Sequence, residues 1–338
     1  MRAFVLTAPG RCAVGDVEEP TAAPGEVVVD VERAGVCGTD VEFFTGGMTY
    51  LKDGHARYPM RIGHEWSGAV SAVGDGIDPA WVGRRVTGDT MLGDGTCRRC
   101  RRGHQHVCAQ RDELGIRGER PGALAERVAV PLFSLHPLPD AVGPALGALV
   151  EPGANALRAA RASAGGEGDR VLVLGPGTIG LLTAMFTRAA GAEVHVAGLT
   201  DASLCFARGL GVLDGCWTHE TLPGLAFDAI VDATDDPAMG AFALERVEPG
   251  GRIVLIGLAD TPSTIDTRRL VLDDVTPVGI LSGSGAIADT ITAYADGAVD
   301  PRPLVAATVG LDGVGAVLAG ERPPGAGGAP KIHVDPRR

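Results

Sequence analysis

Short apolar runs separated by glycine and proline dominate the chain up to about Gly143. The runs are rich in β-branched residues, and several alternate apolar with polar positions, which is typical of strands in a small barrel or sandwich. We therefore expect a β-rich N-terminal region. The clearest runs are residues 25–36 (GEVVVDVERAGV), 67–77 (SGAVSAVGDGI), 83–89 (GRRVTGD) and 126–139 (ERVAVPLFSLHPLP).

The pattern changes after Gly143. Residues 145–162 space leucine and alanine as in a helix, and residues 170–199 have the pattern of a strand, a tight turn, a helix and a second strand. Two further apolar runs, at 226–236 and 250–258, are typical of buried strands. Strands that alternate with helices predict a parallel α/β sheet.

The last part of the chain, from about Thr290, is again turn-rich and β-like. The order β-rich, α/β, β-rich indicates an α/β domain over residues 149–289 that is inserted late in a β-rich domain. That second domain would combine residues 1–148 and 290–338. A length of 338 residues agrees with two domains, since a typical domain has about 150 residues.

A glycine-rich turn marks the start of the predicted α/β domain. Gly175, Gly177 and Gly180 follow the apolar run VLVL and precede a helical pattern. In such a context the first glycine forms the tight turn, the second lets the backbone approach a pyrophosphate, and the third lets helix and strand pack closely. The amides of Thr178 and Ile179 would then face the phosphates from the helix N-terminus. The sequence therefore predicts a dinucleotide site.

The end of the second predicted strand bears on the choice of cofactor. An acidic residue expected there would bind the ribose hydroxyls and repel a 2′-phosphate. Here Gly198, Leu199 and Thr200 stand at this point, and Arg208 is one candidate for a phosphate contact on the following helix. We therefore expect NADP to be accepted at least as well as NAD, and Gly198→Asp to favour NAD, although the site could still take the unphosphorylated cofactor.

Composition excludes several classes of function. The net charge is −12 and no basic block is present, so binding to nucleic acid or to an anionic membrane is not expected. No apolar run reaches the roughly 18 residues of a membrane span, and the start MRAFVLTAPGR lacks the apolar core of a signal peptide. A cytoplasmic protein is the resulting expectation. The seven cysteines are accordingly interpreted as metal ligands or core residues rather than disulfides.

Four residues spread along the chain are candidates for one catalytic metal. Cys37, His64, Glu65 and Glu151 supply sulfur, nitrogen and oxygen ligands, and a catalytic zinc uses a few such ligands and keeps a position open. Each residue alone is more often a core or surface residue. Together with a dinucleotide site, the set indicates a metal-dependent redox enzyme.

A second metal motif lies at residues 97–108. Cys97 and Cys100 form a CxxC pair, and Cys108 follows. In a cytosolic protein this spacing favours a zinc site, whereas a thioredoxin-like role is disfavoured because no βαβ pattern surrounds it. His104 or His106 could complete the ligand set, and a segment that binds no metal is the alternative.

These motifs together resemble the zinc-dependent medium-chain dehydrogenase/reductases, the alcohol dehydrogenase superfamily. The resemblance covers essentially the whole chain. It implies a GroES-like β-rich catalytic domain joined to a Rossmann domain with a doubly wound parallel sheet. The motifs that carry it are GVCGTD (35–40), IGHEWSG (62–68), the cysteine segment, LVEP (149–152), GPGTIG (175–180) and KIHVDP (331–336).

The resemblance also implies metal ligands. Cys37 and His64 match zinc ligands, and Glu65 matches an acid that either binds zinc or exchanges with water. Glu151 stands where simple alcohol dehydrogenases have a cysteine, as in the polyol, sorbitol and sugar dehydrogenase branch. In the structural zinc segment of the family four cysteines occur, and Asp94 occupies the place of the first.

Three further residues receive expected roles from the resemblance. Thr39 matches a hydroxyl that hydrogen-bonds the substrate oxygen, and Asp40 matches an acid that orients the metal site. Glu42 stands where some relatives have a proton-relay histidine. It could relay protons or be a solvated surface acid.

The implied reaction is the reversible oxidation of a secondary alcohol by zinc and NADP or NAD. The implied substrate is a polyol, sugar, cyclitol or aminoglycoside-type molecule, since IGHEWSGAV also resembles cyclitol-amine dehydrogenases of aminoglycoside pathways. A zinc-free enone or quinone reductase and a non-catalytic dinucleotide sensor are the alternatives. Pairing through residues 265–281 would give a homodimer or homotetramer, because exposed sheet edges tend to be covered.

Overall fold

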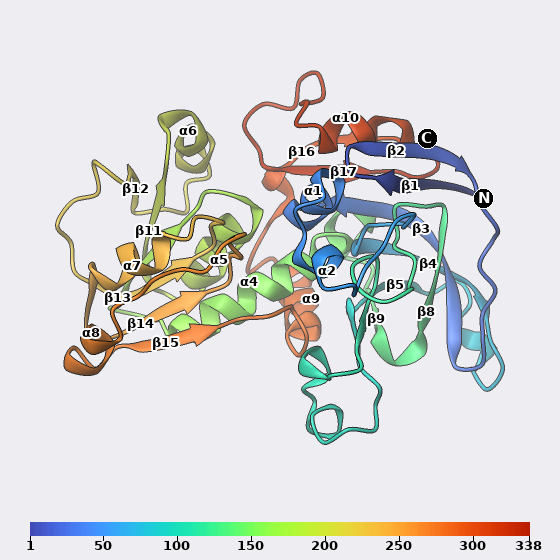
Figure 1. The fold of residues 1–338 in the computed structure, drawn as a ribbon, viewed down its shortest axis with the longest axis horizontal. Helices are drawn as coiled ribbons and strands as arrows, with labels where there is room; N and C mark the ends of the chain where they lie inside the picture. The colour runs from blue at the N-terminus through green and yellow to red at the C-terminus, as the bar shows by residue number, and fades with distance from the viewer.

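The computed structural model describes residues 1–338, apart from the side chain of Ala202. Its two halves are a sheet of parallel strands with helices and a β-rich half (Figure 1). In the β-rich half, a sheet in the described chain has the strand order β16-β17-β3-β4-β5-β9, and β8 also pairs with β3. The strands are β3 (Glu26–Val36), β4 (Glu65–Val73), β5 (Arg85–Gly88), β8 (Arg127–Pro131), β9 (Leu135–Pro137), β16 (Val305–Val309) and β17 (Lys331–Val334).

Smaller elements complete this half. A hairpin of β1 (Arg2–Ala8) and β2 (Arg11–Asp16) packs beside the sheet, and β6 (Met91–Leu92) pairs with β7 (Asp112–Glu113). Its core is built around the fully buried side chains of Phe4, Phe43 and Trp66. The helices are α1 (Gly38–Thr45), α2 (Thr49–Lys52), α3 (Pro144–Gly147) and α10 (Val314–Leu318).

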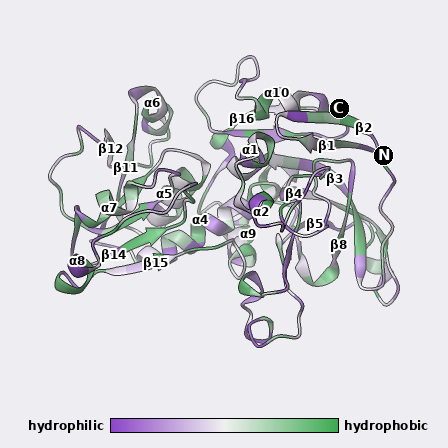
Figure 2. Ribbon diagram, viewed as in Figure 1, coloured by the Kyte–Doolittle hydropathy of each residue, from purple (hydrophilic) through white to green (hydrophobic). Residues whose placement is uncertain are grey.

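The other half contains a parallel sheet with the order β12-β11-β10-β13-β14-β15. Its central strands are mostly apolar, as expected where helices cover both faces, and Figure 2 shows green along part of β14. The strands are β10 (Arg170–Leu174), β11 (Glu193–Gly198), β12 (Gly215–Thr218), β13 (Phe227–Asp232), β14 (Val247–Leu255) and β15 (Thr276–Gly279). The helices are α4 (Val150–Ser163), α5 (Thr178–Ala189), α6 (Asp201–Gly209), α7 (Met239–Leu244), α8 (Thr267–Leu272) and α9 (Ile287–Ala295).

The predicted fold class is confirmed, and each apolar run expected to be a strand contains one. The proposed boundaries of the two domains stay a prediction. One detail differs from expectation. Thr290 lies in helix α9, which packs on α4, and β structure returns only at Val305. Residues 265–281 have edge-strand character in the sequence, and the structure divides them into α8 and the short edge strand β15.

The last strand of the chain brings a buried lysine against the catalytic candidates. β17 pairs with β3 and with β16. Lys331 Nζ donates hydrogen bonds to Glu65 Oε1 at 2.8 Å, to Glu65 Oε2 at 2.6 Å and to the carbonyl of Val36 at 2.9 Å. Both charged side chains are almost fully buried, so each depends on the other for its charge to be tolerated.

Removing one partner should therefore be costly. We expect Lys331→Met to lower the free energy of unfolding by about 3–5 kcal/mol, because Glu65 would be left as an unpaired buried charge. Urea unfolding followed by circular dichroism measures this. The double variant Lys331→Met/Glu65→Gln should recover part of the loss, and a single-variant loss below about 1 kcal/mol would show that the pair is not needed for stability.

Candidate active site

Helix α1 begins at the first candidate ligand. Cys37 is its N-cap residue, and Asp40, one turn into the helix, accepts the Cys37 N–H through Oδ2 at 2.9 Å. Asp40 is fully buried, and burial raises the pKa of its carboxyl group. Its other oxygen, Oδ1, lies 3.8 Å from His64 Nδ1. The structure therefore brings the acid expected to orient the site against the histidine.

The side chains of Cys37, His64 and Glu65 form a compact cluster. One ligand atom of each lies within 4.8 Å of the others. Burial lowers the pKa of His64, but Asp40 and Cys37 outweigh it and raise the pKa well above its ordinary value. Nδ1 of His64 is buried and has no hydrogen-bond partner among the described residues. A sulfur, a nitrogen and an oxygen gathered in one cluster, two of them on buried side chains, fit a zinc ion.

Glu151 lies next to this cluster but outside it. It sits in the first turn of α4 and is buried, which raises its pKa to about 7. Its Oε1 accepts a hydrogen bond from Asn155 Nδ2 at 2.9 Å and from Thr90 Oγ1 at 3.4 Å. The carbonyl of His64 lies equally close to Thr90 Oγ1, at 3.4 Å, so the single hydroxyl hydrogen is shared between the two acceptors. Thr90 thus connects the histidine segment to Glu151.

Three residues around these ligands were not found from the sequence. Lys331, Asn155 and Thr90 each hold a candidate ligand through hydrogen bonds. Asn155 follows Glu151 by four residues on a predicted helix, so its position on the same face was recognisable. Lys331 and Thr90 carry no such local signal, because only the folded sheet brings them to the site.

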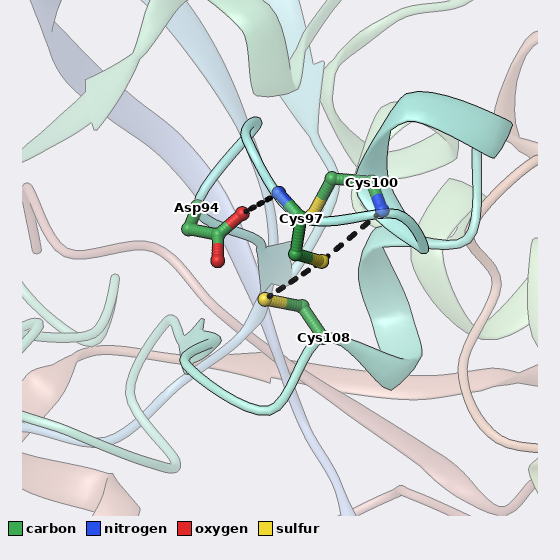
Figure 3. Close-up of side chains that lie close together, drawn as sticks. All are labelled: Asp94, Cys97, Cys100 and Cys108. Atoms are coloured by element: carbon green, nitrogen blue, oxygen red, sulfur yellow. Dashed lines mark hydrogen bonds between the residues drawn. The ribbon is translucent and has the colours of Figure 1, made fainter.

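The segment after β6 gathers the second metal motif. Ligand atoms of Asp94, Cys97, Cys100 and Cys108 all lie within 4.8 Å of one another, and Figure 3 shows the four side chains converging. The sulfurs of Cys97 and Cys108 are 3.8 Å apart, which is far longer than a disulfide. Zn–S bonds of about 2.3 Å in a tetrahedron place two sulfurs about 3.8 Å apart. The four side chains therefore fit a closed zinc site.

Asp94, not a histidine, accompanies the three thiols. Its Oδ1 accepts the N–H groups of Cys97 and Thr96, each at 2.8 Å, and these bonds lower the pKa of Asp94 well below its usual range. His104 and His106 pack edge to face at 5.9 Å and are not part of the group. The structure therefore brings Asp94, and neither histidine, to the three thiols, and its role as a zinc ligand stays a prediction.

A cleft of 760 Å³ lies between the two halves of the molecule at this site. Cys37, Thr39 and Glu42 line it from α1. Burial and then the carboxylates of Asp235 and Asp260 raise the pKa of the half-buried Glu42. The opposite wall contains the glycine turn and the ends of the parallel strands, including Gly175, Pro176, Ile179, Gly198, Leu199 and Thr200.

The glycine turn is shaped as its sequence indicates. Gly175 has a φ of +97°, and a Cβ at Gly180 would lie 1.9 Å from the carbonyl oxygen of Gly175. Gly177 is the N-cap of α5, so the first amides of that helix are free to bind phosphates. The first amides belong to Thr178 and Ile179, which also line a neighbouring cavity of 430 Å³ with Gly177.

The sequence was compared with family models and with known proteins, and both comparisons match dehydrogenases. A model of the alcohol dehydrogenase GroES-like domain matches residues 23–140, and one of the zinc-binding dehydrogenase domain matches residues 178–296. An L-threonine 3-dehydrogenase of Deinococcus deserti is 31% identical over 90% of this chain and 92% of its own. One of Saccharopolyspora erythraea is 33% identical over 83% of each chain.

The chain belongs to the zinc-dependent medium-chain dehydrogenase/reductases. Solved structures resemble this dehydrogenase over 99% of both chains. A short-chain alcohol dehydrogenase of Escherichia coli complexed with NADH has 27% identity and a TM-score of 0.90. A zinc-binding dehydrogenase of Sinorhizobium meliloti bound to NADP has 25% identity and a TM-score of 0.88. The 2R,3R-butanediol dehydrogenase of Bacillus subtilis has 26% identity and a TM-score of 0.86.

Two expectations about the cofactor end of the dehydrogenase need revision. A Cβ at Gly198 would lie 2.9 Å from the ring of Pro176 and 3.1 Å from Leu204, so Gly198→Asp would strain the turn as well as add a charge. Leu199, which is 76% exposed, is the position with room for an acid. Arg208 pairs with Asp201 at 3.1 Å and does not line the cleft.

Among the described residues of the dehydrogenase, no helix is both long enough and apolar enough to cross a membrane.

The cysteine segment of the dehydrogenase yields a test. We expect Cys97→Ser to remove one zinc per chain and to lower the melting temperature, while turnover at 25 °C persists, because a closed site stabilises the fold without touching substrate. Elemental analysis and scanning calorimetry measure both. Cys205→Ser, at an exposed cysteine outside the group, is the control. Wild-type protein with a single zinc per chain would contradict the second site.

Proposed function

We propose that this dehydrogenase oxidises a secondary hydroxyl of a small polyhydroxylated molecule to a ketone, reversibly, with a bound zinc and with NADP or NAD as hydride acceptor. NADP is weakly favoured. One observation carries the proposal. The thiol-bearing Cys37 and the hydroxyl-bearing Thr39 line the same cleft as Gly175 and Gly198, where a Rossmann fold binds a dinucleotide.

The residues present fit both groups. Cys37 and His64 would hold the zinc, and Glu65, which clusters with them, would bind or leave it. Glu151 lies outside this cluster and is the further ligand that the resemblance to the family implies. When bound, the zinc supplies Lewis acidity that lowers the pKa of a hydroxyl, and the nicotinamide supplies the hydride-accepting carbon. The protein contributes the pocket, the orientation and the path of the proton.

Thr39 and Glu42 are the proposed proton carriers. Both lie on α1 and line the cleft. Thr39 accepts the hydroxyl proton in a hydrogen bond from the substrate, and Glu42 passes a proton toward solvent. Burial and two nearby acids raise the pKa of Glu42 toward neutral pH. A proton relay works best when its pKa is near the working pH. Asp40 orients the His64 ring through its Oδ1 atom, which lies 3.8 Å from Nδ1.

The proposed substrate class rests on chemistry around the hydroxyl. The named substrates of two relatives, L-threonine and 2R,3R-butanediol, each carry a secondary hydroxyl beside a second polar group. Glu151 in the ligand position resembles the polyol and sugar branch. Glu42, Asp235 and Asp236 give the cleft an acidic lining, which suits an ammonium group. A cyclitol or aminoglycoside-type amino alcohol is therefore the narrower proposal.

A substrate panel tests the proposal. Sorbitol, inositols, aminocyclitols, an aminoglycoside and L-threonine would each be offered with NADP and with NAD, and reduced nicotinamide would be followed by absorbance. We expect turnover with a polyhydroxylated or amino-substituted ring and little with L-threonine. His64→Ala should abolish turnover and lose the catalytic zinc, because it removes a ligand. His55→Ala, at an exposed histidine, should leave both unchanged.

Two results would contradict this proposal. Full activity in zinc-free protein or in His64→Ala would favour the zinc-free reductase, and an enone or quinone panel would then identify it. Tight dinucleotide binding without turnover of any hydroxylated compound would favour the alternative of a non-catalytic dinucleotide sensor.

We also propose that two copies pair at the β15 edge. β15 ends the parallel sheet, and the neighbouring Val271 and Leu272 are 80% and 81% exposed. Sedimentation at micromolar concentration should show a dimer or tetramer, and the double variant Val271→Ser/Leu272→Ser should shift it toward monomer. Phe133→Ser, which alters an exposed side chain elsewhere, should not. A monomeric wild type would refute the pairing.

A further inference from the structure

His219 occupies a defined place at the cofactor end of the cleft. It directly follows β12, whose last residue, Thr218, is the register partner of Gly198 at the end of β11. His219 lines the cleft together with Leu199 and Thr200. In a Rossmann sheet the adenosine ribose lies at the end of this second strand. The imidazole therefore lines the part of the cleft where a Rossmann fold binds the adenosine ribose.

The turn that carries His219 is held by two threonines. Thr218 and Thr221 share a hydroxyl–hydroxyl hydrogen bond of 2.8 Å. The N–H of Thr218 donates to Thr221 Oγ1 at 3.0 Å, and the N–H of Thr221 donates to Thr218 Oγ1 at 3.2 Å. The His219 ring packs on Phe242, with ring centroids 5.0 Å apart. Its Nε2 is buried without a hydrogen-bond partner among the described residues.

Charge makes this histidine distinctive. The described lining of the cleft contains no lysine or arginine, and it includes the acids Glu42, Asp235 and Asp236. Arg208, the cation expected from the sequence, is engaged by Asp201. His219 is thus the one described lining side chain that can gain a positive charge near neutral pH.

Four influences act on the protonation of His219. Burial lowers its pKa, Asp236 raises it, Arg246 lowers it and Asp232 raises it, and the net result lies below the ordinary value. Arg246 itself lies over the Phe242 ring at 3.5 Å. Near pH 8 the imidazole is therefore neutral, and an adjacent anion would raise its pKa again.

We infer that His219 recognises the 2′-phosphate of NADP, and that its protonation makes the preference for NADP over NAD increase as the pH falls. The imidazolium gives the phosphate a charge-assisted hydrogen bond. The neutral ring can hydrogen-bond a ribose hydroxyl, so NAD binding changes little with pH. The inference rests on the proposed function only in that the cleft takes a nicotinamide dinucleotide.

Binding of two nucleotide fragments tests this without any alcohol substrate. Adenosine 2′,5′-bisphosphate and 5′-AMP would be titrated calorimetrically into the full chain at about pH 6 and about pH 8. A bound 2′-phosphate raises the pKa of the imidazole again, so the ring in that complex is more protonated at the lower pH. The ratio of the two affinities isolates the 2′-phosphate. We expect the wild-type ratio to be about tenfold larger at the lower pH, the size of one charge-assisted hydrogen bond.

Three variants sharpen the result. His219→Gln should abolish the rise, whereas His219→Arg should give a high ratio at both pH values. His55→Gln, at an exposed histidine far along the sequence, should behave as wild type. The 2′-phosphate of the free fragment itself gains a proton near pH 6. The free fragment is the same in all four titrations, so the difference between the proteins reports on His219.

An unchanged pH dependence in His219→Gln would overturn the inference, as would a wild type that binds both fragments equally at the lower pH. Failure of the proposed alcohol oxidation would leave this measurement readable, since the fragments need only the cofactor end of the cleft.

Discussion

The ion pair between Lys331 and Glu65 is the constraint on which much of this structure depends. It is buried and lies between the final strand of the chain and the residue after His64. A charge of either sign alone would be strongly unfavourable there. The metal cluster, the sheet strand β4 and the C-terminal strand must therefore be in place together, which couples the integrity of the site to the return of the chain after the α/β insertion.

The same pair affects how Glu65 can act. Its two oxygens accept hydrogen bonds from Lys331, while one of its ligand atoms remains close to Cys37 and His64. A carboxylate with a fixed cation on one side can approach or leave a metal on the other without ever being unpaired. Glu151 is arranged differently, because neutral donors, Asn155 and Thr90, hold it.

Much of the fold could be predicted from sequence because its signals are local. The strand runs, the glycine turn and the cysteine spacing each depend on residues close together in the chain, and the resemblance to the structural zinc segment of the family pointed to Asp94. Lys331, Thr90 and His219 could not be placed in this way, since each reaches its site from a strand or turn remote in sequence. Gly198 shows a subtler limit. Its identity was noted, but the contact with Pro176 that requires a glycine exists only in the folded turn.

That contact bears on where cofactor preference can be altered. Since a side chain at position 198 would collide with Pro176, a change of cofactor preference is more easily made at neighbours such as Leu199, which is largely exposed. Substitutions at exposed positions usually change stability little. Cofactor preference can thus be altered at the rim of the cleft without changing the glycine turn that binds the dinucleotide.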